Sequence, residues 1–243
     1  MYDSVLNQLR DIGLTIDNFE VDTSDVVRCP VEGDTNKKRS GWYRIYSVIS
    51  KAGNTYYVGK AGNWKNSGLP PSGIAIEYDG KGLSDDDKAA IKQKQQEARK
   101  AADIERVARY KEAATKACKV WDNLSDKGSS SYLTRKKVAG VGVRYTRGTV
   151  VIPVRNIDGA LVGLQFISPD GGKKFLTGTA KAGAFHLLGK VVDDQPVLIA
   201  EGYATGASIH MATNYPVAIA FDAGNIIKVA LVLRKYYPQH SII

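Results

Sequence analysis

Glu201 lies at the end of a predicted strand, a position at which α/β proteins often place catalytic residues. Glu201 directly follows the short apolar run Val197-Leu-Ile-Ala200, and Gly202 comes next. In an α/β sheet, ligands and catalytic groups collect beyond the carboxyl ends of the strands. A glycine at such an end lets the chain turn sharply and lets a substrate phosphate approach the backbone. The pair predicts an acid/base or metal-binding carboxylate beside a phosphate site, although many ordinary surface strands also end in an acid.

The segments around Glu201 predict a parallel α/β unit. A helix-prone segment through Met211 follows it, then an apolar run at residues 216–221, a helix from Ile226 to about Lys235, and a strand-like ending. Strand, helix, strand, helix and strand at this spacing are typical of parallel strands with crossover helices. Upstream, alternating apolar residues predict an antiparallel β-meander, in runs at residues 141–143, 149–154 and 159–167.

The N-terminal part of the chain predicts a short helix and a small β unit. Apolar spacing indicates a helix within residues 1–18 that ends near Gly13, and β-prone runs separated by turns extend from Val26 to about Glu77. Aromatic residues in these runs alternate with basic ones: Trp42, Tyr43, Tyr46, Tyr56, Tyr57 and Trp64 with Arg44, Lys60 and Lys65. Such a face could stack the bases of single-stranded nucleic acid. We favour the alternative that these aromatics form the core of a small domain.

A long helix is predicted in the middle of the chain. No glycine or proline occurs from Lys88 to Asn123, and apolar residues recur at three- and four-residue spacing. Ser84 and the three acids after it suit a capping box better than a metal cluster. The polar stretch of residues 125–131 then predicts a boundary. We divide the chain into a small β domain (1–83), a connector helix (84–127), a basic β subdomain (128–194) and an α/β domain (195–243).

Composition narrows the class of protein. The formal net charge is +9, and it is distributed as zero over residues 1–83, +5 over 84–137 and +4 over 138–243. This balance favours an anionic partner, nucleic acid first. No apolar run approaches the roughly 18 residues of a membrane span, and no signal peptide begins the chain, so we expect a cytoplasmic protein. Cys29 and Cys118 are isolated, so we expect neither a zinc site nor a disulfide.

The segment containing Glu201 also resembles a known signature. Residues 197–208, Val-Leu-Ile-Ala-Glu-Gly-Tyr-Ala-Thr-Gly-Ala-Ser, closely resemble the Glu-Gly-Tyr-Ala-Thr-Ala signature of the toprim-type DNA primases of plasmids and phages. Residues 217–225 and 229–234 are similar to the same toprim domain. Upstream segments resemble the basic subdomain that precedes it, at residues 132–138, 144–147, 150–154 and 173–177. The resemblance covers residues 128–243 well and the aromatic unit weakly.

The resemblance implies synthesis of RNA primers on single-stranded DNA from nucleoside triphosphates, with a replicative helicase as a further partner. Glu201 would be the acid/base or metal-site carboxylate, and Mg²⁺ or Mn²⁺ the cofactor. The implied fold combines α+β and α/β parts in a multidomain chain ending in an incomplete toprim domain. The residues that would bind template or nucleotide are Arg144, Arg147, Lys174, Lys181 and Gly202. Each of these four cations could instead be a solvated surface charge.

Departures from the family pattern limit what we expect of this chain. The family's metal-holding Asp-x-Asp pair does not follow Glu201 in these residues. We therefore expect a fragment that binds DNA and nucleotides and polymerises poorly. Asp222 ends a different strand and is assigned a local structural role, lining the pocket or organising a turn. Gly206 stands where the signature has Ala, and the zinc-ribbon cysteines are missing. The alternative is a non-catalytic module that binds single-stranded nucleic acid or docks a helicase.

Overall fold

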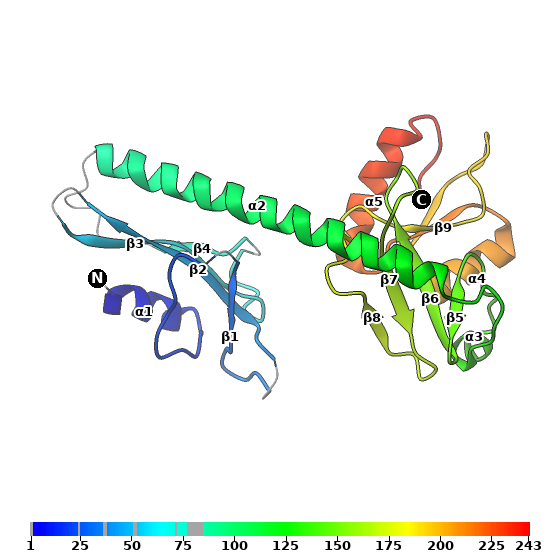
Figure 1. Cartoon of the computed structure of the whole chain (residues 1–243), viewed down its shortest axis with the longest axis horizontal. Coiled ribbons are helices and arrows are strands. Elements are labelled where there is room, and N and C mark those ends of the chain that lie inside the picture. Colours follow the sequence, from blue (N-terminus) through cyan, green and yellow to red (C-terminus); the bar gives the residue numbers. More distant parts are fainter. Residues whose placement is uncertain (1, 24, 36–37, 51–52, 71, 77–84) are drawn as a thin grey trace. The chain divides into compact units, whose positions relative to one another are not determined.

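The computed structural model combines helices with small sheets (Figure 1). It describes residues 2–23, 25–35, 38–50, 53–70, 72–76 and 85–243. Two compact units, Met1–Glu105 and Arg106–Ile243, divide within helix α2 (Asp85–Asp122). In the described ranges, no helix combines the length and the apolar character that crossing a membrane requires. The expected mixture of helix and sheet in a chain of more than one part is therefore present.

The N-terminal unit is an antiparallel sheet with helix α1 (Tyr2–Asp11) on one face. Its strands pair in chain order: β1 (Val27–Cys29), β2 (Gly41–Ile49), β3 (Thr55–Asn63) and β4 (Ile74–Ile76). The apolar side of α1, centred on the fully buried Leu9, packs with Tyr43 and Ile45 of β2. Gly13 ends the helix as predicted, because its φ of +87° lets its N–H bond the Arg10 carbonyl at 2.8 Å.

The second face of the same sheet holds a separate apolar cluster. Tyr46 and Val48 of β2 and Tyr56 and Val58 of β3 are buried, and Ala98 of α2 packs on them. The alternation of side chains along each strand explains why neighbouring aromatics serve different cores. The predicted long helix is present as α2, whereas Ser84, on which the predicted capping box depends, lies outside the described residues.

The C-terminal unit contains an antiparallel meander, whose first strand begins at Arg144 and so just after the predicted run of residues 141–143. After helix α3 (Ser131–Lys136), four antiparallel strands pair in chain order: β5 (Arg144–Thr146), β6 (Thr149–Arg155), β7 (Leu161–Ile167) and β8 (Lys173–Phe175). The end of α2 packs on this sheet, where Ala117 meets the fully buried Val151 and Leu164. The C-terminal part of the apolar stripe predicted for the long helix therefore packs on this sheet, whereas Ile104 of the same stripe is exposed.

The parallel α/β unit that contains Glu201 follows the meander. Strands β10 (Leu198–Ala200) and β11 (Val217–Ile219) pair in parallel, and helices α4 (Tyr203–Thr213) and α5 (Ala223–Tyr236) follow them. Ile242 forms a parallel bridge with Val197, so the third predicted strand is present as a short pairing. Strand β9 (His186–Leu188), which pairs antiparallel with β11, was not predicted from the sequence.

Gly206 explains how α4 lies so close to its strands. A Cβ at this buried position would lie 2.1 Å from Ile219 Cδ1, 3.2 Å from Val217 Cγ1 and 3.3 Å from the Cβ of Ala200. Ile219 is itself fully buried, so its side chain has little room to move. The glycine that departs from the signature is therefore matched to the isoleucine beneath it.

We expect Gly206→Ala to lower the free energy of unfolding by about 1 kcal/mol. Overpacking a core costs roughly 1–3 kcal/mol, and the gain in helix propensity offsets about 1 kcal/mol. In an Ile219→Val background, which removes the clashing Cδ1, the same change should be neutral or stabilising. Urea unfolding of the four proteins in this double-mutant cycle measures the coupling. Equal effects of Gly206→Ala in both backgrounds would contradict the packing argument.

Candidate functional site

Glu201 lies at the carboxyl end of β10 with its side chain exposed to solvent. The neighbouring strand β11 runs in parallel, and the Ala220 N–H donates to the Ala200 carbonyl at 2.8 Å. Residues that follow the two strands therefore leave the sheet at the same edge, Glu201 from one and Asp222 from the other. This is the edge at which α/β sheets bind ligands.

Gly202 takes the N-cap position of α4 with φ −123° and ψ 153°. This extended conformation is open to any residue, so the sharp turn inferred from the sequence is not the reason for a glycine here. An added Cβ would come within 3.5 Å of one side-chain atom, Lys173 Nζ of strand β8. The glycine therefore leaves space between the start of α4 and a lysine ammonium group.

That space is part of a polar pocket of about 430 Å³. Its walls come from the α3 region, the turn before β8, β8 and the start of α4: Tyr132, Arg135, Lys136, Asp170, Gly171, Lys173, Gly202, Ala204 and Thr205. Arg135, Lys136 and Lys173 contribute three cations to it. The carboxylate of Asp170 accepts a hydrogen bond from the Ser168 hydroxyl. This bond is the main reason that the pKa of Asp170 is lowered. With three cations and one carboxylate, the side chains that line the pocket carry a net positive charge.

The N-terminus of α4 adds to this positive character. The first backbone N–H groups of a helix lack intrahelical acceptors and carry a partial positive charge, which makes them ready anion sites. Gly202 provides no side-chain cap for α4, and Ala204 and Thr205 of its first turn line the pocket, where the Ala204 N–H donates to the Tyr132 hydroxyl. Helix terminus, three cations and a missing Cβ together suit a ligand with several phosphate oxygens.

Lys181 and Asp222 form an ion pair beside the same sheet edge. The Lys181 ammonium group also lies 5.2 Å from the centre of the Phe175 ring, which meets Phe221 edge to face. Phe221 has φ +73°, a left-handed conformation that is strained for a bulky residue. Asp222 is the residue before α5, and its side chain forms an ion pair with Lys181 instead of a cap hydrogen bond to the helix.

Lys174 and Arg147 lie elsewhere on the meander. In the register of β7 and β8, Lys174 pairs with Phe166 while Lys173 pairs with Ile167, so the two lysines point to opposite faces. Arg147 is exposed in the turn between β5 and β6, where it and Gly148 both have positive φ. The structure therefore brings Lys173, and neither of these two cations, to the pocket beside Gly202.

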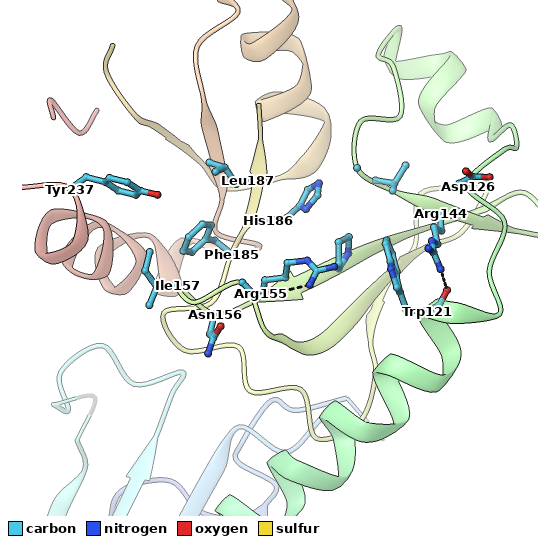
Figure 2. Close-up of a pocket in the computed structure, with 14 residues that line it drawn as sticks. Trp121, Asp126, Arg144, Arg155, Asn156, Ile157, Phe185, His186, Leu187 and Tyr237 are labelled. Atoms are coloured by element: carbon cyan, nitrogen blue, oxygen red, sulfur yellow. Dashed lines mark hydrogen bonds between the residues drawn. The ribbon is translucent and has the colours of Figure 1, made fainter. Parts of the chain in front are cut away.

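Arg144 belongs to a different pocket, of about 530 Å³ (Figure 2). Its guanidinium donates to the Trp121 carbonyl and lies 4.7 Å from the centre of that tryptophan ring. Arg155, which donates to the Gly159 carbonyl at 2.7 Å, lines the same pocket. The two pockets share no lining residue. The contacts of Arg144 hold the end of α2 on the meander, apart from Glu201.

A buried histidine lies beside this second pocket. His186 stacks on Tyr203 with ring centroids 6.1 Å apart, and its Nε2 lies 3.2 Å from the Val141 carbonyl. Burial, and to a smaller extent the charge of Arg155, lower the pKa of His186 to about 4. The neutral ring is therefore part of the fold at pH 7.

We expect this histidine to make unfolding easier at acidic pH. The unfolded chain binds the proton with a pKa near 6.5 and the folded chain only near 4, so stability falls as pH drops through this window. The contribution is about 3 kcal/mol, because each pKa unit corresponds to 1.36 kcal/mol. Urea unfolding between pH 7 and pH 4 should show a steeper loss in the native chain than in His186→Gln. Parallel pH profiles would contradict this assignment.

Three residues of the Gly202 pocket were not singled out from the sequence: Arg135, Lys136 and Lys173. All three fall in segments that resemble the basic subdomain, residues 132–138 and 173–177. Lys173 could have been found from strand alternation, because it shares a face with Phe175 in β8. Among the described residues, no group of three or more His, Cys, Asp or Glu side chains is placed to hold a metal ion.

Comparison with known proteins gives distant but extensive similarity. Two proteins of Escherichia coli named DNA primase TraC are 27% identical over 224 residues and 28% identical over 228 residues, each covering 89% of this chain. The chain spans only 20% and 15% of their lengths. No family model matches the chain. The resemblance to DNA primases expected from the Glu201 segment is confirmed.

A solved structure gives a weaker match. It contains bacteriophage T7 lagging-strand DNA polymerase with primase domains bound to an RNA/DNA hybrid and dTTP. The two chains are 18% identical, the matched region covers 48% of this chain and 64% of the other, and the TM-score is 0.36. A likeness at this level is too remote for element-by-element comparison.

Proposed function

We propose that this chain is a segment of a DNA primase of the plasmid and phage type and contributes its nucleotide-handling site. The observation that carries the proposal is the positive pocket at the start of α4, whose lining residue Gly202 directly follows the exposed Glu201. The similarity to DNA primase TraC over 89% of the chain supports it. The proposal assigns the protein to the cytoplasm, with single-stranded DNA as template and nucleoside triphosphates as substrates.

The pocket residues suit the charge changes of nucleotidyl transfer. A 3′-hydroxyl attacks the α-phosphorus of the incoming nucleotide, a new oxygen–phosphorus bond forms, and the bond to the β-phosphate breaks as pyrophosphate leaves. Lys173, Arg135 and the first amides of α4 would bind the polyphosphate and offset the charge that develops on the leaving group. Glu201 would accept the proton of the attacking hydroxyl. Binding and orientation of phosphate is the larger part of this chemistry.

The expected metal is proposed for the complete primase. Magnesium prefers several carboxylates together with water and phosphate oxygens. Here Glu201 is exposed and available, while Asp222 is already paired with Lys181. We propose that Glu201 contributes one ligand and that residues outside this chain contribute the rest. In the same way, we propose that residues 195–243 form part of a toprim domain preceded by the basic subdomain of residues 128–194.

Binding of nucleotides tests the proposed function. Calorimetric titration of the chain with a nucleoside triphosphate should show binding that inorganic triphosphate displaces, because the pocket recognises phosphate oxygens rather than a base. A nucleoside without phosphates should not bind. A chain that binds neither nucleotide nor triphosphate, or that binds the nucleoside equally well, would count against the proposal.

A non-catalytic role remains the second candidate. Helix α2 exposes Ile104 by 71% and Val107 by 49%, three residues apart, which could dock another protein such as a replicative helicase. Under this alternative the chain would bind nucleic acid or its partner without binding nucleotides. The nucleotide titration separates the two candidates. A titration with labelled single-stranded DNA at two salt concentrations would then show how much binding depends on phosphate contacts.

A further inference from the structure

A group of tryptophans and cations lies at one end of the N-terminal sheet. We call Arg28, Trp42 and Trp64 the tryptophan platform. Trp42 of β2 pairs with Arg28 of β1 on one side and with Gly62 of β3 on the other. Trp64 follows β3 directly, and its N–H donates to the Ser40 carbonyl at 3.0 Å. The platform is thus built on three neighbouring strands.

Two glycines let the Trp42 indole lie flat on the sheet. A Cβ at Gly62 would lie 2.6 Å from Trp42 Nε1, and a Cβ at Gly73 would lie 2.6 Å from Trp42 Cη2. Neither position could hold a side chain while the ring stays where it is. Gly73 also has φ +72°, which favours glycine independently. The sheet therefore holds this ring in one orientation.

The second tryptophan extends the platform into solvent. The Trp64 ring lies 6.1 Å from the Trp42 ring with an interplanar angle of 33°, and Arg28 Cζ lies 3.9 Å from its centroid. Arg28 is itself fixed by two hydrogen bonds from its guanidinium to the Arg39 carbonyl, at 3.1 and 2.6 Å. Trp64 is nevertheless 52% exposed. A large aromatic ring thus contacts Arg28 and Trp42 and still leaves about half of its surface open to a ligand.

The charges around the platform indicate the kind of ligand. Arg28 of β1 and Lys60 of β3 lie on the two strands that flank β2, and Lys60 is exposed. Lys65, by contrast, is neutralised by Asp34 at 2.8 Å. An open indole beside cations fits unpaired bases, each of which has a π-face, joined by phosphates. A duplex hides its base faces, so it would not use the ring.

We propose that the tryptophan platform binds single-stranded nucleic acid by stacking bases on Trp64. This interpretation separates the aromatic residues of the unit into two sets: Tyr43, Tyr46 and Tyr56 are core, and Trp64 with its support is the binding surface. The inference goes beyond the nucleotide site, from which it is independent in residues and in test. In a primase the platform would hold the template strand.

The test compares variants of the full chain by fluorescence anisotropy. The probes are labelled oligothymidylate and oligouridylate of about 15 nucleotides, long enough for one binding module. Trp64→Leu should weaken binding of the preferred strand about 5- to 100-fold, because stacking accounts for roughly 1–3 kcal/mol per base. Trp64→Phe keeps a π-face and should lose less than about fivefold. Tyr236→Leu, which removes another exposed ring, should bind like the native chain.

Two further measurements keep the proposal open to refutation. Binding should quench the tryptophan emission, and Trp64→Leu should remove most of that quenching. Arg28→Gln, which keeps the rings, should weaken binding several-fold and lower the salt dependence. Native affinity in Trp64→Leu, equal binding of a duplex of the same length, or no binding of either oligonucleotide overturns the platform. A nucleotide titration of Trp64→Leu should be unchanged, so failure here is distinct from failure of the proposed function.

Discussion

Glu201→Gln is expected to lower primer synthesis by the complete primase about 100-fold or more. The amide keeps the size of the side chain but cannot accept the hydroxyl proton and lacks the negative charge that attracts a cation, and a positioned acid/base group contributes typically 10²–10⁴-fold. Because Glu201 is exposed at the carboxyl end of β10, the change should leave the unfolding midpoint unaltered. Incorporation of labelled nucleotide into short RNA on single-stranded DNA measures the rate.

Asp193→Asn is the matched control for this experiment. It removes an exposed carboxylate from the same unit, at a position away from the Gly202 pocket. Its synthesis rate should equal that of the native protein. Glu201→Gln should also bind nucleotide at least as tightly as native protein, since it removes a negative charge beside the phosphate site. Native synthesis rates in Glu201→Gln would remove this carboxylate from the mechanism.

Lys173→Gln is expected to weaken nucleoside triphosphate binding about tenfold or more, and Lys174→Gln to leave it unchanged. The two substitutions change the net charge equally, but only Lys173 lines the Gly202 pocket. A charge-assisted hydrogen bond contributes roughly 1.5–3 kcal/mol, which corresponds to this loss of affinity. Calorimetric titrations of both variants with the same nucleotide measure the difference.

The pair of lysines also tests whether general electrostatics is sufficient. If long-range attraction to a basic surface were the cause, both substitutions would weaken binding by the same small factor, and added salt would remove it. A contact in the pocket requires that Lys173→Gln alone shows the loss. Combining it with Arg135→Gln should weaken binding further, because both cations border the same space. Equal affinities for the two single variants would show that the pocket does not bind the polyphosphate.

The frame of the site follows from local pattern in the sequence. The apolar runs before Glu201 and Asp222 are short and continuous, which indicates buried parallel strands, and both form as predicted. Alternation of apolar residues also predicts strands β6 and β7, whereas the predicted run at residues 141–143 ends just before β5. Strand β9 was missed because three residues between Gly183 and Gly189 are too short to show a period. Its place is determined by pairing with β11, a contact distant in sequence.

The side chains that complete the site depend on tertiary placement. Lys173 and Lys174 are equivalent in composition, and a register of one residue decides which of them reaches the pocket. Arg144, which the resemblance groups with the nucleotide-binding cations, donates to the carbonyl of Trp121 at the end of α2, a contact that spacing does not reveal. In the N-terminal unit, too, tertiary packing decides which aromatic residues are buried in the core and which, like Trp64, are exposed. Spacing identifies the elements, whereas packing selects their functional faces.

The most direct test is to locate a bound nucleotide by amide NMR of the isotopically labelled chain. Titration with a non-hydrolysable nucleoside triphosphate should shift the backbone amides of Gly202, Ala204 and Thr205, together with those of Gly171 and Lys173 across the pocket. Resonances of Trp121 and Arg144 should stay in place. Shifts confined to the Trp121 pocket, with the start of α4 unperturbed at saturation, would contradict a phosphate site beside Glu201.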